Sequence, residues 1–314
     1  MSRRAFTMFA PAAACGAALA LALPGQRTSN PMDLAAEAAR DPYTRNDPGR
    51  MKALGYVSFG PFHWNLTSTS TANLRSTLGE PRIRFIETAH FRLGCAMAPR
   101  KLPSDTRLRR MVVKELQQLR KSLPRVPRTV RTLDRWLLTH LYAQRLENLY
   151  ADFSALLGVD ESDFPPPERT GKSGQPGSRG RGRYLGQRDK FCVILFDAET
   201  QLLRYLKAFA DYKGKVAGPR RHDFTKIGSL GFATASQCGS GALFDDAQMH
   251  AHVVSEVAKN LAIGYKAHLV QLPSWFIEGL GHYYGRGIDP KISRLDETVD
   301  PNRLAGRAWD WGRR

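Results

Sequence analysis

The chain has 314 residues, with 47 Lys and Arg against 29 Asp and Glu, which gives a formal net charge of +18. This surplus favours anionic partners, such as acidic polymers, phospholipid headgroups or nucleic acid, but says little about the fold. Three cysteines, Cys95, Cys192 and Cys238, lie after the N-terminal segment. Their odd number and the lack of Cys-x-x-Cys spacing exclude a disulfide framework but are compatible with one disulfide and a free thiol in an exported protein.

Residues 1–23 are a predicted signal peptide. Arg3 and Arg4 precede an apolar run rich in Ala and Leu, and residues 20–22 offer a small-x-small cleavage site. Paired arginines followed by x-Phe resemble the twin-arginine signal, which carries folded proteins across a bacterial inner membrane; an ordinary secretory signal is the alternative. Either predicts an exported protein, periplasmic or extracellular. No later stretch approaches the ~18 to 20 apolar residues of a membrane span.

Residues 24–80 are predicted to form a lead-in and a strand region. The lead-in is polar and interrupted by prolines, with one short helix at residues 33–40. A strand is predicted at residues 56–64, interrupted at Gly60 and Pro61.

Residues 83–93 alternate bulky and polar side chains over the length of a strand, with a bend. His90 lies in this segment. A lone histidine in a strand is typical of a packed or edge position, so we do not assign His90 to a site.

Two helices and a low-complexity insertion follow. Residues 105–123 and 132–157 have helical periodicity, and the second segment carries a broad apolar face. Residues 164–183 are rich in Pro, Gly, Ser and Arg, which predicts a disordered basic insertion. Nucleic-acid binding by this insertion is disfavoured, because no aromatic side chain is interleaved before Tyr184.

The next segments predict a sheet. Residues 191–196 are continuously apolar, which is typical of a central buried strand. Residues 200–212 form an amphipathic helical pattern, and residues 228–237 predict a further strand.

Most residues able to do chemistry lie on two predicted helices near the end of the chain. Residues 246–262 have helical periodicity, and Gly264 is expected as a left-handed C-cap. Ser274 is the expected N-cap of the second helix, and residues 289–314 form a charged tail. His252 and Glu256 lie one turn apart on the first helix, where their side chains can meet. Glu278 lies in the second turn of the next helix.

These helices resemble the zinc site of the gluzincin-type (peptidase MA-like) metallopeptidases, because the second carries W-x-x-E-G-L-x-x-Y from Trp275. In that family the first helix holds H-E-x-x-H, whose histidines bind zinc and whose Glu is the general base, and the second helix supplies a third ligand. His252 and Glu278 match two ligands. Val253 occupies the motif position of the general base, and Glu256 occupies that of the second histidine ligand.

The resemblance implies an α+β fold for residues 81–288, a mixed sheet followed by a helical half. It also implies that residues 228–237 form an edge strand beside the metal-type helix.

The departures from the motif alter the expected chemistry. Val253 cannot accept a proton, and general-base catalysis contributes about two to four orders of magnitude in rate. A set of His252, Glu256 and Glu278 would still suit zinc or another divalent ion. Lys259, three residues after Glu256, would pair with that carboxylate and repel a cation. No cofactor is therefore assigned from sequence.

Three functional hypotheses follow. The first is an exported, catalytically inactive peptidase-like protein that uses the cleft of the former active site to bind a peptide or an anionic polymer. The second is an active metallohydrolase with a His252, Glu256 and Glu278 site, in which Glu256 or His282 acts as the base. The third is a basic structural or polymer-binding protein whose cleft is idle. His250 points to another side of the helix and is expected to be structural.

Overall fold

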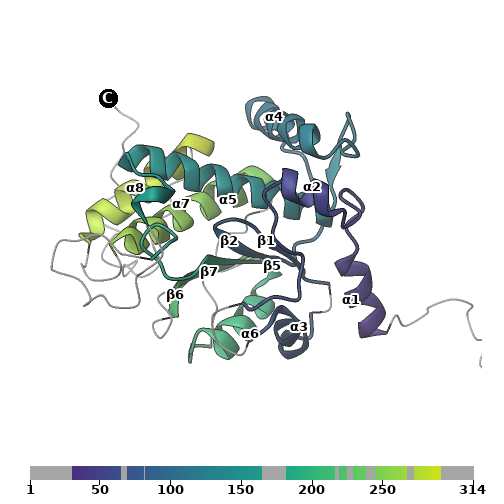
Figure 1. The fold of residues 1–314 in the computed structure, drawn as a ribbon, viewed down its shortest axis with the longest axis horizontal. Coiled ribbons are helices and arrows are strands. Elements are labelled where there is room, and N and C mark those ends of the chain that lie inside the picture. The colour runs from purple at the N-terminus through teal and green to yellow at the C-terminus, as the bar shows by residue number, and fades with distance from the viewer. Residues whose placement is uncertain are drawn as a thin grey trace, which may run out of the picture.

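A five-stranded mixed sheet organises the protein, with strands in the order β1-β2-β5-β7-β6 (Figure 1). The computed structural model describes residues 30–64, 69–80, 82–164, 182–215, 219–224, 229–237, 243, 245–266 and 272–290. The predicted signal peptide, nearly all of the predicted basic insertion and all but the first two residues of the predicted tail lie outside the described residues. No helix in the described part has both the length and the apolar character needed to cross a membrane.

The elements run in this order: α1 (Pro31–Ala39), α2 (Pro48–Ala53), α3 (Thr71–Leu78), β1 (Arg84–Glu87), β2 (Phe91–Cys95), β3 (Arg100–Lys101), α4 (Thr106–Ser122), β4 (Thr132–Leu133), α5 (Arg135–Leu157), the 3-10 helix η1 (Glu161–Asp163), β5 (Phe191–Ala198), α6 (Glu199–Phe209), β6 (Arg220–Phe224), β7 (Ser229–Gln237), α7 (Asp246–Tyr265) and α8 (Ser274–Ile288). The predicted α+β class is confirmed.

Strands β2, β5 and β7 are parallel, and the antiparallel strands β1 and β6 flank them. The central position predicted for residues 191–196 is confirmed, because β5 pairs on both sides and its first six residues are buried. The single bent strand predicted at residues 83–93 is instead the hairpin of β1 and β2. The strand predicted at residues 56–64 is not formed, and only isolated bridges from Ser58 and His63 remain.

Helices cover both faces of the sheet. Figure 1 shows α5 and α7 on one face and α3 and α6 on the other. Successive side chains of β5 point to opposite faces of the sheet, so this strand contributes to the hydrophobic core on each face. Phe191, Val193 and Leu195 pack with α5 and α7. Cys192, Ile194 and Phe196 pack with α6 on the opposite face. This alternation fixes the register, because a slip of one residue would exchange the two faces.

The long helices begin and end where local chemistry predicts. Asp105 caps α4, and Asp134 caps α5 by accepting hydrogen bonds from the amides of Trp136 and Leu137. Gly158, with φ of 66°, ends α5 in the left-handed conformation that glycine adopts without a steric penalty.

The described part of the lead-in is fastened to α5 by a buried polar cluster. Asp41 Oδ2 lies 3.1 Å from His140 Nε2, and the hydroxyl of Tyr56 lies 2.9 Å from His140 Nδ1. The side chains of Asp41 and His140 are both fully buried. Residues 33–40, expected as a short helix, correspond to α1.

Three expectations near the candidate site are corrected. Strand β7, expected at the edge, lies inside the sheet, because the basic segment Arg220–Phe224 pairs with its outer side. Gly264 is not a left-handed cap but lies inside α7, which continues to Tyr265. A Cβ there would lie 3.0 Å from Gln187 and Phe191, so close packing explains the glycine. Pro273, not Ser274, is the N-cap of α8.

Candidate functional site

Helix α7 packs on the sheet beside α5, and α8 lies against α7 (Figure 1). Sixteen of the twenty residues of α7 are buried, including polar ones such as His252, Lys259 and Asn260. A buried charged group is costly unless it is paired, so the partners of these residues define what the region can do.

The ammonium of Lys259 links α7 to α8. Its Nζ donates to Glu256 Oε1 at 2.8 Å and to Glu278 Oε2 at 2.9 Å. The Lys259 side chain is 1% exposed, and those of Glu256 and Glu278 are 13% and 16% exposed. The two carboxylates that sequence placed in a metal site are thus brought together, with an ammonium between them.

A second cation reaches this cluster from the sheet. Arg221 Nε, on β6, lies 3.2 Å from Glu256 Oε2. Glu256 therefore has one cation on each oxygen, and the cluster pairs two cations with two carboxylates. Mutual pairing of this kind offsets part of the cost of losing hydration on burial.

Gly281 of α8 makes room for Lys259. A Cβ at Gly281 would lie 2.4 Å from Lys259 Cε and 2.9 Å from Ser255 Oγ, which is closer than atoms can approach. The absence of a side chain at this position therefore lets the lysine stem pass against α8.

His252 faces the sheet. Its Nε2 lies 3.2 Å from the hydroxyl of Thr234 on β7, and its ring packs edge-on against Phe232. Among the residues that the structure describes, no group of three or more His, Cys, Asp or Glu side chains is arranged to hold a metal ion. As arranged, with Lys259 between the carboxylates, these residues do not fit a zinc centre.

The other candidates for proton transfer have different surroundings. Val253 is buried and packs in the hydrophobic core, so the general-base position holds an aliphatic group. His282, the reserve base, is half-buried. Burial and the charges of Arg286 and Lys259 lower its pKa, and they outweigh the opposite effect of Glu278. His282 is therefore neutral at neutral pH.

His250 belongs to a separate buried network, which agrees with the structural role expected for it from the sequence. Arg145 of α5 donates to Asp246 Oδ2 at 2.6 Å and to Glu115 Oε2 at 2.8 Å, which ties α4, α5 and α7 together. His250 Nδ1 lies 3.8 Å from Glu115 Oε1. Burial, followed by the charge of Arg145, holds the pKa of His250 well below its usual value.

His90 has partners that sequence reasoning missed. It follows β1 in the turn to β2, where its Nδ1 lies 2.7 Å from Glu147 Oε2 and its ring stacks on Tyr150. Its Nε2 lies 3.2 Å from Glu161 Oε1. These partners come from α5 and η1, and no local sequence signal identifies them.

Comparison with protein-family models, with characterised proteins and with solved structures gave no match. The chemical interpretation therefore rests on the residues and the geometry described above.

Proposed function

We propose that this chain is an exported peptidase-like protein of the gluzincin type that has lost catalysis and binds an extended peptide or an anionic polymer without cleaving it. The observation that carries the proposal is the Lys259 ammonium held between Glu256 and Glu278. In this interpretation the lysine supplies the positive charge that a metal ion would otherwise bring to the same helix pair.

The chemistry of the site supports loss of catalysis. Two carboxylates facing each other need a cation, and Lys259 provides one that cannot polarise a carbonyl or bind a hydroxide as a metal does. Val253 removes the proton acceptor from the adjacent position on α7. Both parts of a metal-dependent hydrolysis are therefore replaced by groups that stabilise structure.

Strand β6 is the surface that we assign to ligand binding. It pairs with β7 on one side, and no other described strand pairs with its outer side. An extended peptide can add to such an edge through main-chain hydrogen bonds. Arg220 is exposed on this strand, and its positive charge favours a ligand with acidic side chains.

Exposed aromatic side chains on α8 support a binding role. Trp275 is 76% exposed and Tyr283 is 66% exposed. Large aromatic groups are enriched in protein interfaces because one rigid side chain buries much apolar area.

The test uses the purified protein and a fluorescent acidic peptide, followed by anisotropy at increasing salt. Arg220→Glu should weaken binding by roughly tenfold, since it reverses a charge at the proposed edge. Lys114→Glu is the matched control, because Lys114 is exposed on α4, away from β6. If both variants weaken binding equally, affinity comes from total charge, and the protein is a basic polymer-binding protein with an idle cleft.

Hydrolysis is tested separately. Peptidase activity that depends on zinc and is lost in His252→Ala would favour the active metallohydrolase, with its His252, Glu256 and Glu278 site. Export is tested by cell fractionation of the full chain and of a chain in which Arg3 and Arg4 are replaced by lysine.

A further inference from the structure

Helix α4 and the segment after it carry a concentration of positive charge. Residues 106–132 contain nine Lys and Arg side chains and one acidic side chain, Glu115. This segment is less than a tenth of the chain, yet it holds eight of the eighteen net positive charges. Because α4 lies at the periphery of the molecule, on the outer side of α5, these charges can meet a partner (Figure 1).

Four of the cations form one line along α4, the basic stripe: Arg107, Arg110, Lys114 and Lys121, all of them exposed. At about 100° per residue, the four side chains fall within an arc of about 60° on the helix surface. From the first to the last, the helix rises by about 21 Å. The buried side chains of α4 lie on the opposite side of the helix: Val112, Leu116 and Leu119.

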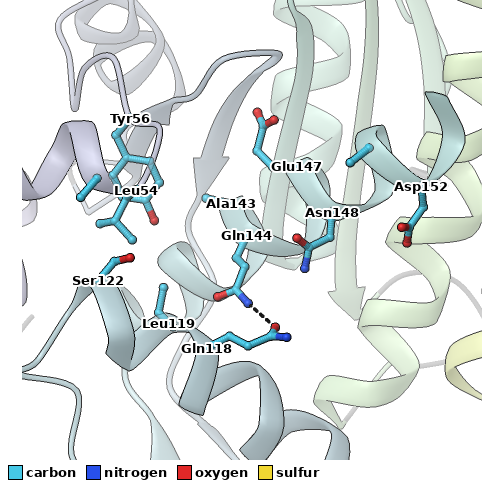
Figure 2. Close-up of a pocket in the computed structure, with 12 residues that line it drawn as sticks. Leu54, Tyr56, Gln118, Leu119, Ser122, Ala143, Gln144, Glu147, Asn148 and Asp152 are labelled. Carbon is cyan, nitrogen blue, oxygen red and sulfur yellow. Dashed lines mark hydrogen bonds between the residues drawn. The ribbon is translucent and has the colours of Figure 1, made fainter. Parts of the chain in front are cut away.

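Contacts with α5 fix the helix that carries the stripe. Gln144 Nε2 of α5 donates to Gln118 Oε1 at 3.1 Å (Figure 2). Arg145 of α5 lies 2.8 Å from Glu115 Oε2. The one carboxylate of the segment is thus paired with α5 and does not neutralise the stripe.

The segment after α4 extends the positive surface. Arg120, in the last turn of α4, donates to the carbonyl oxygens of Pro127 at 2.6 Å and Arg128 at 3.2 Å. These bonds hold the segment against the end of the helix. Three exposed arginines therefore lie in a segment that is fixed beside the stripe: Arg125, Arg128 and Arg131.

The stripe is not compensated within the protein. No ion pair joins its four side chains to a carboxylate of the described residues, whereas buried cations such as Arg145 and Lys259 are paired. A single contact between exposed charges contributes little to affinity. A line of such cations therefore favours a linear polyanion, which can contact several of them at once.

The other side chains of the segment narrow the class of polyanion. Residues 106–132 contain no aromatic side chain, so they offer no stacking surface for the bases of a single-stranded nucleic acid. Val113, which is 37% exposed, is the one exposed large apolar side chain of α4, so the helix has no outer apolar face to insert into a membrane. Basic clusters without aromatic groups are typical of surfaces that bind acidic polysaccharides.

We propose that the basic stripe of α4 and the arginines after it bind a linear acidic polysaccharide. The carboxylate or sulfate groups of such a polymer repeat along its length, and guanidinium groups bind these anions through paired hydrogen bonds. A polysaccharide is favoured over duplex nucleic acid for an exported protein, and this step rests on the export included in the proposed function. The surface shares no residue with β6, α7 or α8.

The test measures binding of the purified full chain to polygalacturonate, a linear polysaccharide with one carboxylate per sugar, by isothermal titration calorimetry. Methyl-esterified polygalacturonate is the neutral probe with the same backbone. The acidic polymer should bind with an affinity that falls steeply with salt, and the ester should not bind. Removing the four charges of the stripe should weaken binding by roughly tenfold or more. This stripe variant combines Arg107→Gln, Arg110→Gln, Lys114→Gln and Lys121→Gln.

The matched control removes the same number of exposed charges from α6 and the segment after it: Arg204→Gln, Lys207→Gln, Lys213→Gln and Lys215→Gln. It should weaken binding by no more than about twofold, because charges more than about 10 Å from the polymer are screened at 0.1 M salt. Absence of binding, equal binding of the ester, or equal losses in the two variants would each overturn the proposal. Tighter binding of a short DNA duplex or of phosphatidylglycerol vesicles through the same stripe would also overturn it.

The proposals for α4 and β6 can fail separately. Arg220→Glu should leave the affinity for polygalacturonate unchanged. The stripe variant should leave binding of the acidic peptide at β6 unchanged, because a short peptide gains little from single exposed contacts on α4.

Discussion

Replacing Lys259 by methionine should destabilise the protein more than any change of an exposed lysine. Methionine keeps the volume of the stem and removes the ammonium, so Glu256 and Glu278 face each other without the cation between them. Removing one partner of a buried ion pair costs about 3 to 5 kcal/mol. Because both carboxylates keep some exposure and Arg221 still contacts Glu256, we expect about 3 kcal/mol.

The assay is equilibrium unfolding in urea. Lys259→Met should lower the midpoint and the free energy of unfolding, with the slope unchanged, since the surface exposed on unfolding stays the same. Lys207→Met is the control, because Lys207 is exposed on α6. It should change stability by no more than about 0.5 kcal/mol.

A compensated variant distinguishes charge repulsion from lost packing. Lys259→Met combined with Glu256→Gln and Glu278→Gln removes the two charges that the lysine had neutralised. Replacing a buried ammonium and its carboxylate partners by neutral groups is often nearly neutral for stability. Arg221 remains, but its side chain is 18% exposed and can be hydrated, so this variant should recover most of the loss. The reasoning is refuted if Lys259→Met unfolds like the control, or if the triple variant is less stable than the single one.

Three further predictions, which use four variants, test the surroundings of the site. Gly281→Ala should lower the free energy of unfolding by about 1 to 3 kcal/mol, because its Cβ would overlap Lys259. Gly279→Ala is the control and should stabilise α8 by up to about 1 kcal/mol, because a Cβ there meets nothing within 4 Å. Equal changes in melting temperature for the two variants would contradict this. Arg145→Met should lower the free energy of unfolding by about 3 to 5 kcal/mol, since it leaves the fully buried Asp246 carboxylate without its cation, and an unchanged melting temperature would count against the network. His250 has a lowered pKa in the folded state, so the unfolded chain binds the extra proton and stability falls as pH drops below about 6.5. His250→Gln should therefore reduce this loss of stability by up to about 1.4 kcal/mol per pH unit. The measurement is the free energy of unfolding in urea at several pH values. If the wild type and His250→Gln lose stability equally as pH falls, His250 is protonated in the folded state and the reasoning is wrong.

Hydrophobic periodicity was sufficient to predict the central strand and the long helices. The run at residues 191–196 and the helical patterns of α4, α5, α7 and α8 are local signals, and each element is formed. The outer strand β6 was missed because its sequence, Arg220–Phe224, is polar and basic, and only its pairing with β7 makes it a strand. Because β6 pairs with β7, the edge of the sheet is β6 and not β7. This depends on tertiary pairing, which a local sequence pattern does not predict.

The contacts of the candidate site also fall into those that local spacing predicts and those that depend on tertiary packing. The contact between Lys259 and Glu256 follows from their spacing of three residues on one helix. The contact between Lys259 and Glu278 depends on how α8 crosses α7 and on the space left by Gly281, so spacing alone does not predict it. Helical spacing placed His252 and Glu256 on one side, but their observed partners lie on different strands, Thr234 on β7 and Arg221 on β6.

The most direct test of the central claim, that Lys259 takes the place of a metal ion, is the zinc content of the purified protein and of one designed variant. The wild-type chain should carry no stoichiometric zinc. A variant with Val253→Glu, Glu256→His and Lys259→Ala restores the general base and the second histidine ligand of the family motif and removes the competing ammonium. It should take up one zinc ion per chain. Wild-type protein that purifies with stoichiometric zinc and loses it in His252→Ala would contradict the account.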